Sequence, residues 1–217
     1  MDEHTIPAAT LETIRQEARQ AGADGMDIGE RIHAITLRAI EQRSLNATEI
    51  KAVLAAVTAG VNLGLAERGD DIAQSLRAAV SGMDQALAKS AQSLQLMVEE
   101  MLANGREFRE GELKQSLQTL RDLEHLLIDA IRQTADTSAG TLKAETNRLV
   151  SHLKTSGSDA GGQALDSLTQ LVGGLRAAAH SGKISIEHGA REIASRAALF
   201  AGGLLTGAGE ALRNKAK

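Results

Sequence analysis

The sequence predicts an all-α fold, an elongated antiparallel helical bundle or coiled coil with two long central helices and shorter flanking helices. Hydrophobic residues make up 42% of the 217 residues, which is enough to bury a core, but aromatic residues make up only 1% and proline occurs once. Alanine and leucine, which favour helices, supply most of the apolar content. Because an alanine side chain buries little area, we expect thin seams between helices rather than a wide globular core.

The N-terminal unit, residues 1–45, is expected to hold two short helices. The first accepts Pro7 in its first turn, where the missing N–H costs nothing. Gly22 and Gly25 mark the break after it. The second helix runs over about residues 26–42, where isoleucines recur at helical spacing and predict one buried face.

The central unit, residues 46–156, is expected to be a long antiparallel helical hairpin. Asn46 and Glu49 have the spacing of a capping box and predict a helix start. Gly69 could end that helix, but the apolar residues keep helical phase across it. We therefore expect one continuous or slightly kinked helix over residues 46–104, on the order of 85 Å long at 1.5 Å per residue.

Beyond residue 76, the apolar spacing tightens to seven residues in two columns, one of which Ser90 interrupts. Such spacing predicts a coiled-coil seam. A second helix starts after Gly105, continues the apolar stripe more thinly and stops before Gly157, and the short turn between the two predicts an antiparallel pair. The expected seam residues are Leu76, Val80, Met83, Leu87, Leu94, Met97, Met101, Leu113, Leu117, Leu120, Leu127 and Ile131.

The C-terminal unit, residues 157–217, has a different character. The segment SGSDAGG at residues 156–162 is rich in glycine and serine and is expected to be a linker. A helix over about residues 163–179 and a final helix over about 186–213 should follow as a C-terminal pair.

Two glycine pairs at four-residue spacing lie in the most apolar stretches of the chain. They are Gly60 with Gly64, and Gly203 with Gly207. Since a glycine costs a helix about 1 kcal/mol relative to alanine, such pairs indicate close approach of two helix backbones. Packing within a bundle or on a symmetry mate is one interpretation, and insertion into an apolar interface such as a lipid monolayer is the other.

No pattern in the sequence points to catalysis. The six histidines are scattered, with no two of them three or four residues apart, and the chain has no cysteine. A nucleophile elbow, a phosphate-binding loop and a dinucleotide fingerprint are all missing from the sequence. We therefore expect no enzyme, no catalytic residue, no metal site and no cofactor.

Charge and hydropathy restrict the expected partners and location. The 24 basic and 28 acidic residues alternate along the chain and give a net charge of −4, so nucleic acid is not an expected partner. The apolar runs at residues 52–66 and 197–209 are shorter than the roughly 20 residues of a membrane-spanning helix, so no transmembrane span is expected. The acidic start MDEHT is unlike a secretory signal, which favours a cytoplasmic protein.

Three segments carry a resemblance to a known family. They are TLRAIEQRSL at residues 36–45, AVTAGVNLGLAERG at 56–69 and NGREFREGELKQSLQTLRDLEHL at 104–126. They resemble a bacterial family of helical proteins of unknown function, which implies no activity and no catalytic residues. In composition alone, the chain is also similar to phasins, the amphipathic helical proteins that coat polyhydroxyalkanoate granules; this likeness is an analogy.

These observations lead to a hypothesis of function by contact. The protein is expected to be a non-enzymatic, self-associating helical protein that coats a hydrophobic granule or a lipid surface as phasins do. The alternative is a soluble coiled-coil scaffold or adaptor whose apolar faces are permanently buried against other helices. An enzyme with a site between helices is the remaining and least favoured alternative.

Overall fold

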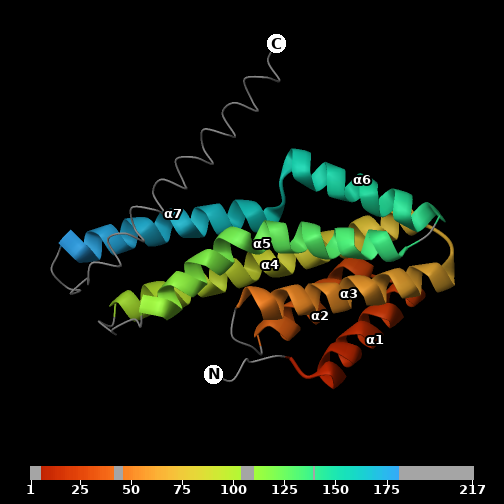
Figure 1. The fold of residues 1–217 in the computed structure, drawn as a ribbon, viewed down its shortest axis with the longest axis horizontal. Coiled ribbons are helices and arrows are strands. Elements are labelled where there is room, and N and C mark those ends of the chain that lie inside the picture. Colours follow the sequence, from red (N-terminus) through yellow and green to blue (C-terminus); the bar gives the residue numbers. More distant parts are fainter. Residues whose placement is uncertain (1–5, 42–45, 104–109, 139, 181–217) are drawn as a thin grey trace, which may run out of the picture.

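The computed structural model describes residues 6–41, 46–103, 110–138 and 140–180, and within these ranges the chain forms seven α-helices and no strand (Figure 1). The predicted all-α fold is thus confirmed. The expected final helix over 186–213, with Gly203 and Gly207, lies outside the described residues. The helices are α1 (Ala8–Asp24), α2 (Ile28–Glu41), α3 (Ala47–Arg68), α4 (Ile72–Ala103), α5 (Glu110–Thr137), α6 (Gly140–Ser156) and α7 (Asp159–His180).

The first six helices form three hairpins, α1–α2, α3–α4 and α5–α6, which stack side by side in sequence order (Figure 1). α1 packs mainly on α3, α2 on α4, and α3 also on α5. α1 and α3 run in the same direction, because Arg15 lies beside Gly60 and Ala23 lies beside Gly64. Among the first six helices, α1, α3 and α5 therefore form one row and α2, α4 and α6 another, as in proteins built from repeated helical hairpins.

The first two hairpins turn with the same backbone conformation. Gly25 and Gly69 are left-handed, with φ of 74° and 77°, and the aspartates two residues later, Asp27 and Asp71, have φ of 47° and 42°. Glycine adopts this conformation without steric cost, and aspartate is among the few other residues that visit it. Both turns have the sequence Gly-x-Asp-Ile, a repeat that the sequence analysis missed.

The expected continuous helix over residues 46–104 is wrong at Gly69. α3 ends at Arg68, and the Gly69 N–H caps it by donating to the Leu65 carbonyl at 2.9 Å. The left-handed cap reverses the chain, so the apolar residues on either side belong to two antiparallel helices that face one core. The Arg68 side chain fixes this turn by pairing with Asp70 and, at 3.8 Å, with Asp71.

The second expected long helix is also divided. α5 ends at Thr137 and α6 begins at Gly140, whose φ is 57°. Asn62 of α3 holds this turn in place, because its Nδ2 donates to Ser138 Oγ at 3.0 Å. The expected linker over 156–162 is shorter than predicted, since only residues 157–158 separate α6 from α7. Residue 156 ends α6, and residues 159–162 form the first turn of α7.

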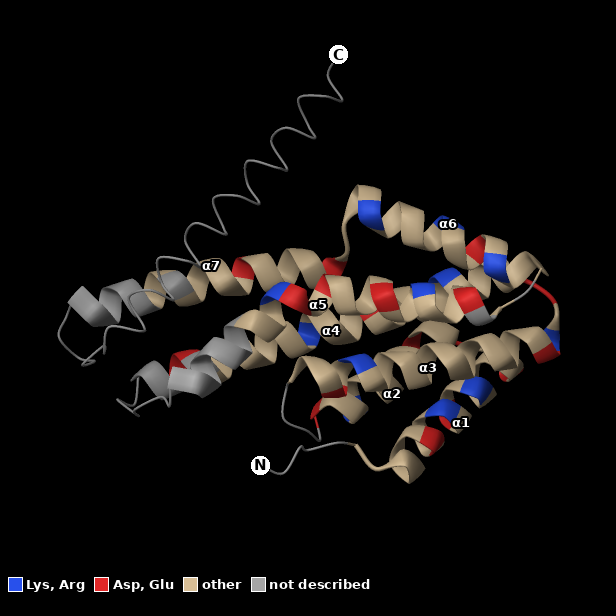
Figure 2. Ribbon diagram, in the orientation of Figure 1, with Lys and Arg blue, Asp and Glu red and all other residues tan. Residues whose placement is uncertain are grey.

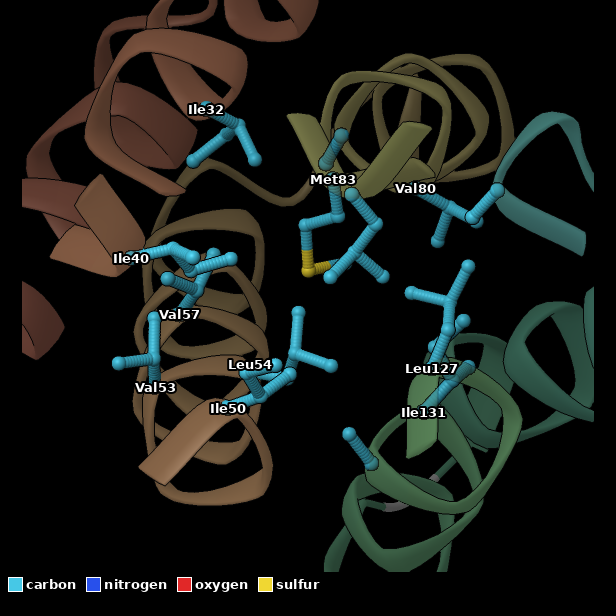
Figure 3. Close-up of a cluster of buried hydrophobic side chains, with 14 of the residues drawn as sticks. Ile32, Ile40, Ile50, Val53, Leu54, Val57, Val80, Met83, Leu127 and Ile131 are labelled. Atoms are coloured by element: carbon cyan, nitrogen blue, oxygen red, sulfur yellow. The ribbon is translucent and has the colours of Figure 1, made fainter. Parts of the chain in front are cut away.

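A cluster of buried apolar side chains runs from Ile6 to Leu171 and includes residues of all seven described helices. Figure 3 shows Met83 of α4 between side chains of α2, α3 and α5, among them Leu54 and Leu127. Thr58 lies in the same cluster, with its Oγ1 3.6 Å from the Met83 sulfur. Residues 1–45, expected as a unit of their own, thus contribute α1 and α2 to this same cluster.

α3 begins where the capping pattern predicts. The Asn46 side chain accepts a hydrogen bond from the Glu49 N–H at 2.8 Å and satisfies an amide that the helix itself leaves free. At this end of α3, α4, α5 and α7 extend beyond α1, α2 and α3, to the left in Figure 1. The molecule is therefore elongated, with a thick N-terminal part and a thinner distal part of three helices.

Candidate functional site

The candidate site lies in the packing surfaces between helices. Within the described ranges, no group of three or more His, Asp or Glu side chains is placed to hold a metal ion. The packing instead has two features that need an explanation: backbone contacts through glycine, and polar contacts between α7 and α4.

Gly60 and Gly64 lie at the contact between α3 and α1. A Cβ atom built on Gly60 would lie 2.2 Å from the Arg15 carbonyl oxygen, and one built on Gly64 would lie 2.1 Å from the Arg19 carbonyl oxygen. Contacts this short leave no room for any side chain, so the two backbones touch directly. The structure thus gives this pair a place inside the bundle, where the neighbour is α1 of the same chain.

Two further glycines make such contacts, and sequence reasoning missed them. Gly22, expected to mark a helix break, lies inside α1, and a Cβ there would be 2.9 Å from the Val61 carbonyl oxygen. In the second row, a Cβ on Gly82 of α4 would lie 2.2 Å from the Gly29 carbonyl oxygen of α2. The first two hairpins therefore stack through glycine in both rows. A local sequence pattern cannot reveal these contacts, because each one joins two helices that are distant in sequence.

Most of the expected seam residues are buried, and they lie on α4 and α5. The buried members are Leu76, Val80, Met83, Leu87, Leu94, Leu120, Leu127 and Ile131. The side chains of Met101, Leu113 and Leu117 lie outside the described residues.

Met97 departs from the seam prediction, because its side chain is 48% exposed and the neighbouring Leu96 is 57% exposed. A straight helix drifts about 20° per seven residues, so the column that starts at Leu76 has rotated by about 60° when it reaches Met97. Leu94 keeps its place in the core while Met97 turns outward. The distal part of α4 thus presents two adjacent apolar side chains to solvent.

α7 lies along α4 in the same direction and in register. Near its start, the Asp159 N–H donates to Asp84 of α4, and farther on Gln170 Oε1 accepts from Gln95 Nε2 at 2.6 Å; both contacts join residues 75 apart. The equal offset shows that the two helices advance together over this stretch. The contacts mark the two ends of a common surface.

Between these two polar contacts, α7 buries small side chains. On α7, Ala160, Ala164 and Ser167 are buried at helical spacing, and Leu171 follows one turn later. On α4, Ala91 is buried between Asp84 and Gln95. We call the surface of α4 from Asp84 to Gln95, together with Glu124 of α5, the α7-binding face.

The start of α7 lies between two carboxylates. Asp84 is 7% exposed, and its two oxygens accept the N–H groups of Asp159 and Ala160, both at 2.8 Å. Burial raises the pKa of Asp84 above its ordinary value of 3.8, while the two backbone hydrogen bonds act in the opposite direction. On the other side, the Glu124 carboxylate packs on Gly161, where a Cβ would lie 2.8 Å from its carboxyl carbon. Acceptors at a helix N-terminus satisfy amides that the helix leaves unpaired.

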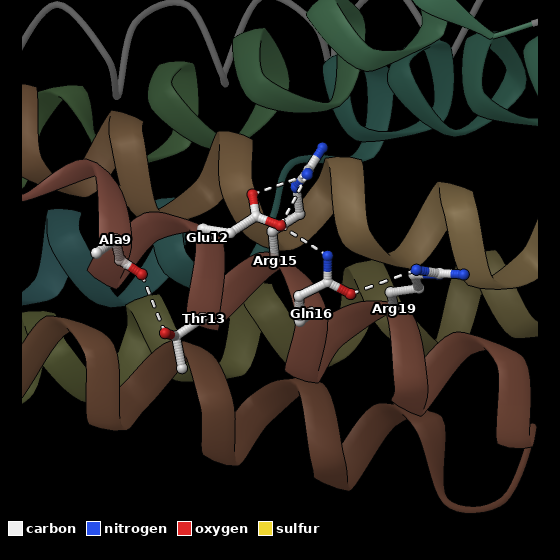
Figure 4. Close-up of polar contacts among 6 residues, drawn as sticks. All are labelled: Ala9, Glu12, Thr13, Arg15, Gln16 and Arg19. Atoms are coloured by element: carbon white, nitrogen blue, oxygen red, sulfur yellow. Dashed lines mark hydrogen bonds and ion pairs between the residues drawn. The ribbon is translucent and has the colours of Figure 1, made fainter.

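The outer side of the first hairpin is polar. Glu12 accepts hydrogen bonds from Arg15 at 2.8 Å and from Gln16 at 2.6 Å, and Gln16 accepts one from Arg19 at 3.4 Å (Figure 4). Arg19 also pairs with Glu67 of α3 at 2.6 Å. A polar outer face ends a stack of hairpins, because no further hairpin needs to cover it.

Charge does not select a face in the view of Figure 2, in which basic and acidic residues are interspersed over the coloured helices. One described helix, α3, is long and apolar enough to cross a membrane by length and composition alone. In the structure, 61% of its apolar window is buried by other parts of the chain, as in the core helix of a bundle. Among the described helices there is thus no clear transmembrane span.

Comparison with known proteins finds a matching family model. A model of a family of unknown function, DUF6781, matches residues 5–214, nearly the whole chain. No curated protein and no solved structure matches significantly. Since the match spans both the stacked hairpins and α7, the chain belongs to DUF6781, a helical family of unknown function.

Proposed function

We propose that the protein is a non-enzymatic helical scaffold that works by binding other helices, with the α7-binding face as its binding surface. This corresponds to the alternative that the sequence left open, a protein whose apolar faces are covered by helices. The observation that carries the proposal is the in-register contact of α7 with α4, with a polar contact at each end.

The α7-binding face has the parts that helix recognition requires. Asp84 offers acceptors for the free amides at a helix start, which fixes direction and position along α4. Ala91 and the small residues of α7 permit close approach, and Gln95 adds a second polar contact that fixes register. Laying a helix with anchors at helical spacing on such a face is a common mode of peptide recognition.

A peptide of residues 158–180 tests the proposal on the full chain. The labelled peptide should bind the full chain, and fluorescence anisotropy measures this binding. The chain's own α7 competes with the peptide at an effective concentration on the order of 1 mM. The control is the variant Gln95→Cys/Gln170→Cys, closed with a short bismaleimide cross-linker, which is specific because the natural chain has no cysteine. Equal binding by the open and the closed variant, or no binding by either, would contradict the proposal.

The second candidate is the phasin-like coating of a hydrophobic granule or lipid surface, and the exposed pair Leu96 and Met97 favours it. Two exposed apolar side chains on the distal part of α4 could start contact with an apolar surface. Flotation with phospholipid-covered triolein droplets tests this candidate. The full chain should float with the droplets, and the variant Leu96→Gln/Met97→Gln should not; a chain that stays in the aqueous phase removes the coating hypothesis.

A further inference from the structure

We propose that the α7-binding face accepts α7 of a second copy of this chain, so that two molecules associate by exchanging their α7 helices. This inference rests on the proposed function and names the partner helix. All contacts that hold α7 within one chain can be made in the same way between two chains, which is the basis of helix exchange between identical proteins.

The attachment of α7 makes it separable from its own chain. It packs on α4 and α5 rather than on α6, its neighbour in sequence. Only Gly157 and Ser158 join it to α6, and the Gly157 N–H caps α6 by donating to Leu153 O at 2.8 Å. α6 therefore ends properly without α7, and the left-handed Gly157, with φ of 78°, is a place where the chain can change direction at low cost.

Along this part of α4, α7 buries small side chains. Between Asp84 and Gln95 it buries Ala160, Ala164 and Ser167, which lose little apolar contact when the helix leaves. In contrast, α3 is tied to α1 by direct backbone contact at Gly60 and Gly64. α7 is thus the described helix that the fold can release while the stacked hairpins stay folded.

The polar contacts at the two ends select the incoming helix. A helix on this face needs free amides at its start, which donate to Asp84. It also needs a hydrogen-bonding side chain 11 residues farther on, which meets Gln95. The spacing is the same on both helices because each contact joins residues that are 75 apart. Ser158 adds a local cap, since its Oγ accepts from the Gly161 N–H at 3.0 Å. α7 of any copy meets these requirements together.

Two single-cysteine variants of the full chain test the exchange. Gln95→Cys and Gln170→Cys are prepared separately and mixed at a concentration on the order of 1 mM, which is comparable with the effective concentration that a short linker provides. The mixture is then treated with a short bismaleimide cross-linker. Exchange should give a covalent dimer that contains one chain of each variant, identified by mass spectrometry. The control mixture pairs Gln95→Cys with Lys143→Cys, because Lys143 is exposed on α6, away from the contact.

Each outcome decides the inference. A mixed dimer well above the control supports it, and Asp84→Ala should then speed its formation about fivefold, as loss of a helix cap predicts. A yield equal to the control overturns it. If the 158–180 peptide binds while the mixed dimer does not form, the face binds helices but not those of a second copy; if neither occurs, the proposed function fails as well.

Discussion

Replacing Gly64 with alanine measures how strongly the first two hairpins depend on direct backbone contact. The added Cβ would lie 2.1 Å from the Arg19 carbonyl oxygen and 2.6 Å from the Ala23 nitrogen. Ordinary contact begins at 3.4 Å, so α1 and α3 must separate by about 1.3 Å at this point. Both neighbours are backbone atoms and cannot rotate away, so the whole helix pair must shift.

The magnitude follows from two opposing effects. Overpacking of a well-packed interior costs about 1–3 kcal/mol and sometimes more, and a rigid backbone neighbour places Gly64 at the upper end. Alanine returns about 1 kcal/mol through its better helix propensity. We therefore expect a net loss of about 2 kcal/mol, which lowers the urea midpoint by roughly 1 M.

Urea unfolding followed by circular dichroism at the helix band measures the change, with two matched controls. Gly173→Ala on α7 has nothing within 4 Å of the new Cβ and should raise stability by up to about 1 kcal/mol. Gly29→Ala, with its nearest neighbour at 3.2 Å, should be close to neutral. A Gly64→Ala midpoint at or above that of the natural chain would show that α1 and α3 do not depend on backbone contact at Gly64.

Three further predictions concern polar contacts. Asn46→Ala should cost about 1 kcal/mol, because the Glu49 N–H loses its cap, and Asn46→Gly should cost less; urea midpoints of the two variants distinguish this from a general surface effect. Asn62→Ala should lower the free energy of unfolding by about 1 kcal/mol and raise the hydrogen-exchange rate in the α5–α6 turn, which the Asn62–Ser138 hydrogen bond holds. An unchanged exchange rate in this turn would contradict the prediction. Because the pKa of Asp84 is raised in the folded state, this carboxyl should support folding most below about pH 3.8 and less as the pH rises through the raised pKa. Asp84→Asn should therefore flatten the pH dependence of α7 protection while Asp84→Ala lowers protection throughout, as hydrogen exchange between pH 3 and 7 can show.

The sequence could predict what is local. The start of α3 at Asn46 depends on a cap formed within four residues, and the structure has it as expected. The break at Gly69 was harder, because the apolar phase continues across it and argues for one helix. The phase continues since α3 and α4 face the same core from antiparallel helices, which is a property of the tertiary structure.

The sequence could not predict which helices meet. The pair Gly60 and Gly64 indicates close approach, but its partner is α1, which lies in the preceding hairpin rather than next in sequence. The α7-binding face was missed for the same reason, because Asp84 and Ala160 are far apart along the chain and only the stack brings them together. The signal that could have revealed the stack is the repeated Gly-x-Asp-Ile turn, which marks equivalent positions in two hairpins.

The separation of 75 residues between α4 and its companion α7 has a consequence during synthesis on the ribosome. α1 to α4 can complete their mutual contacts as soon as they emerge, since each pairs with a helix made shortly before it. The α7-binding face of α4 must then wait, uncovered, until α5 and α6 have been translated, and bringing such distant segments together is slow. A nascent chain paused in this interval would offer that side to the neighbouring nascent chain on the same messenger RNA.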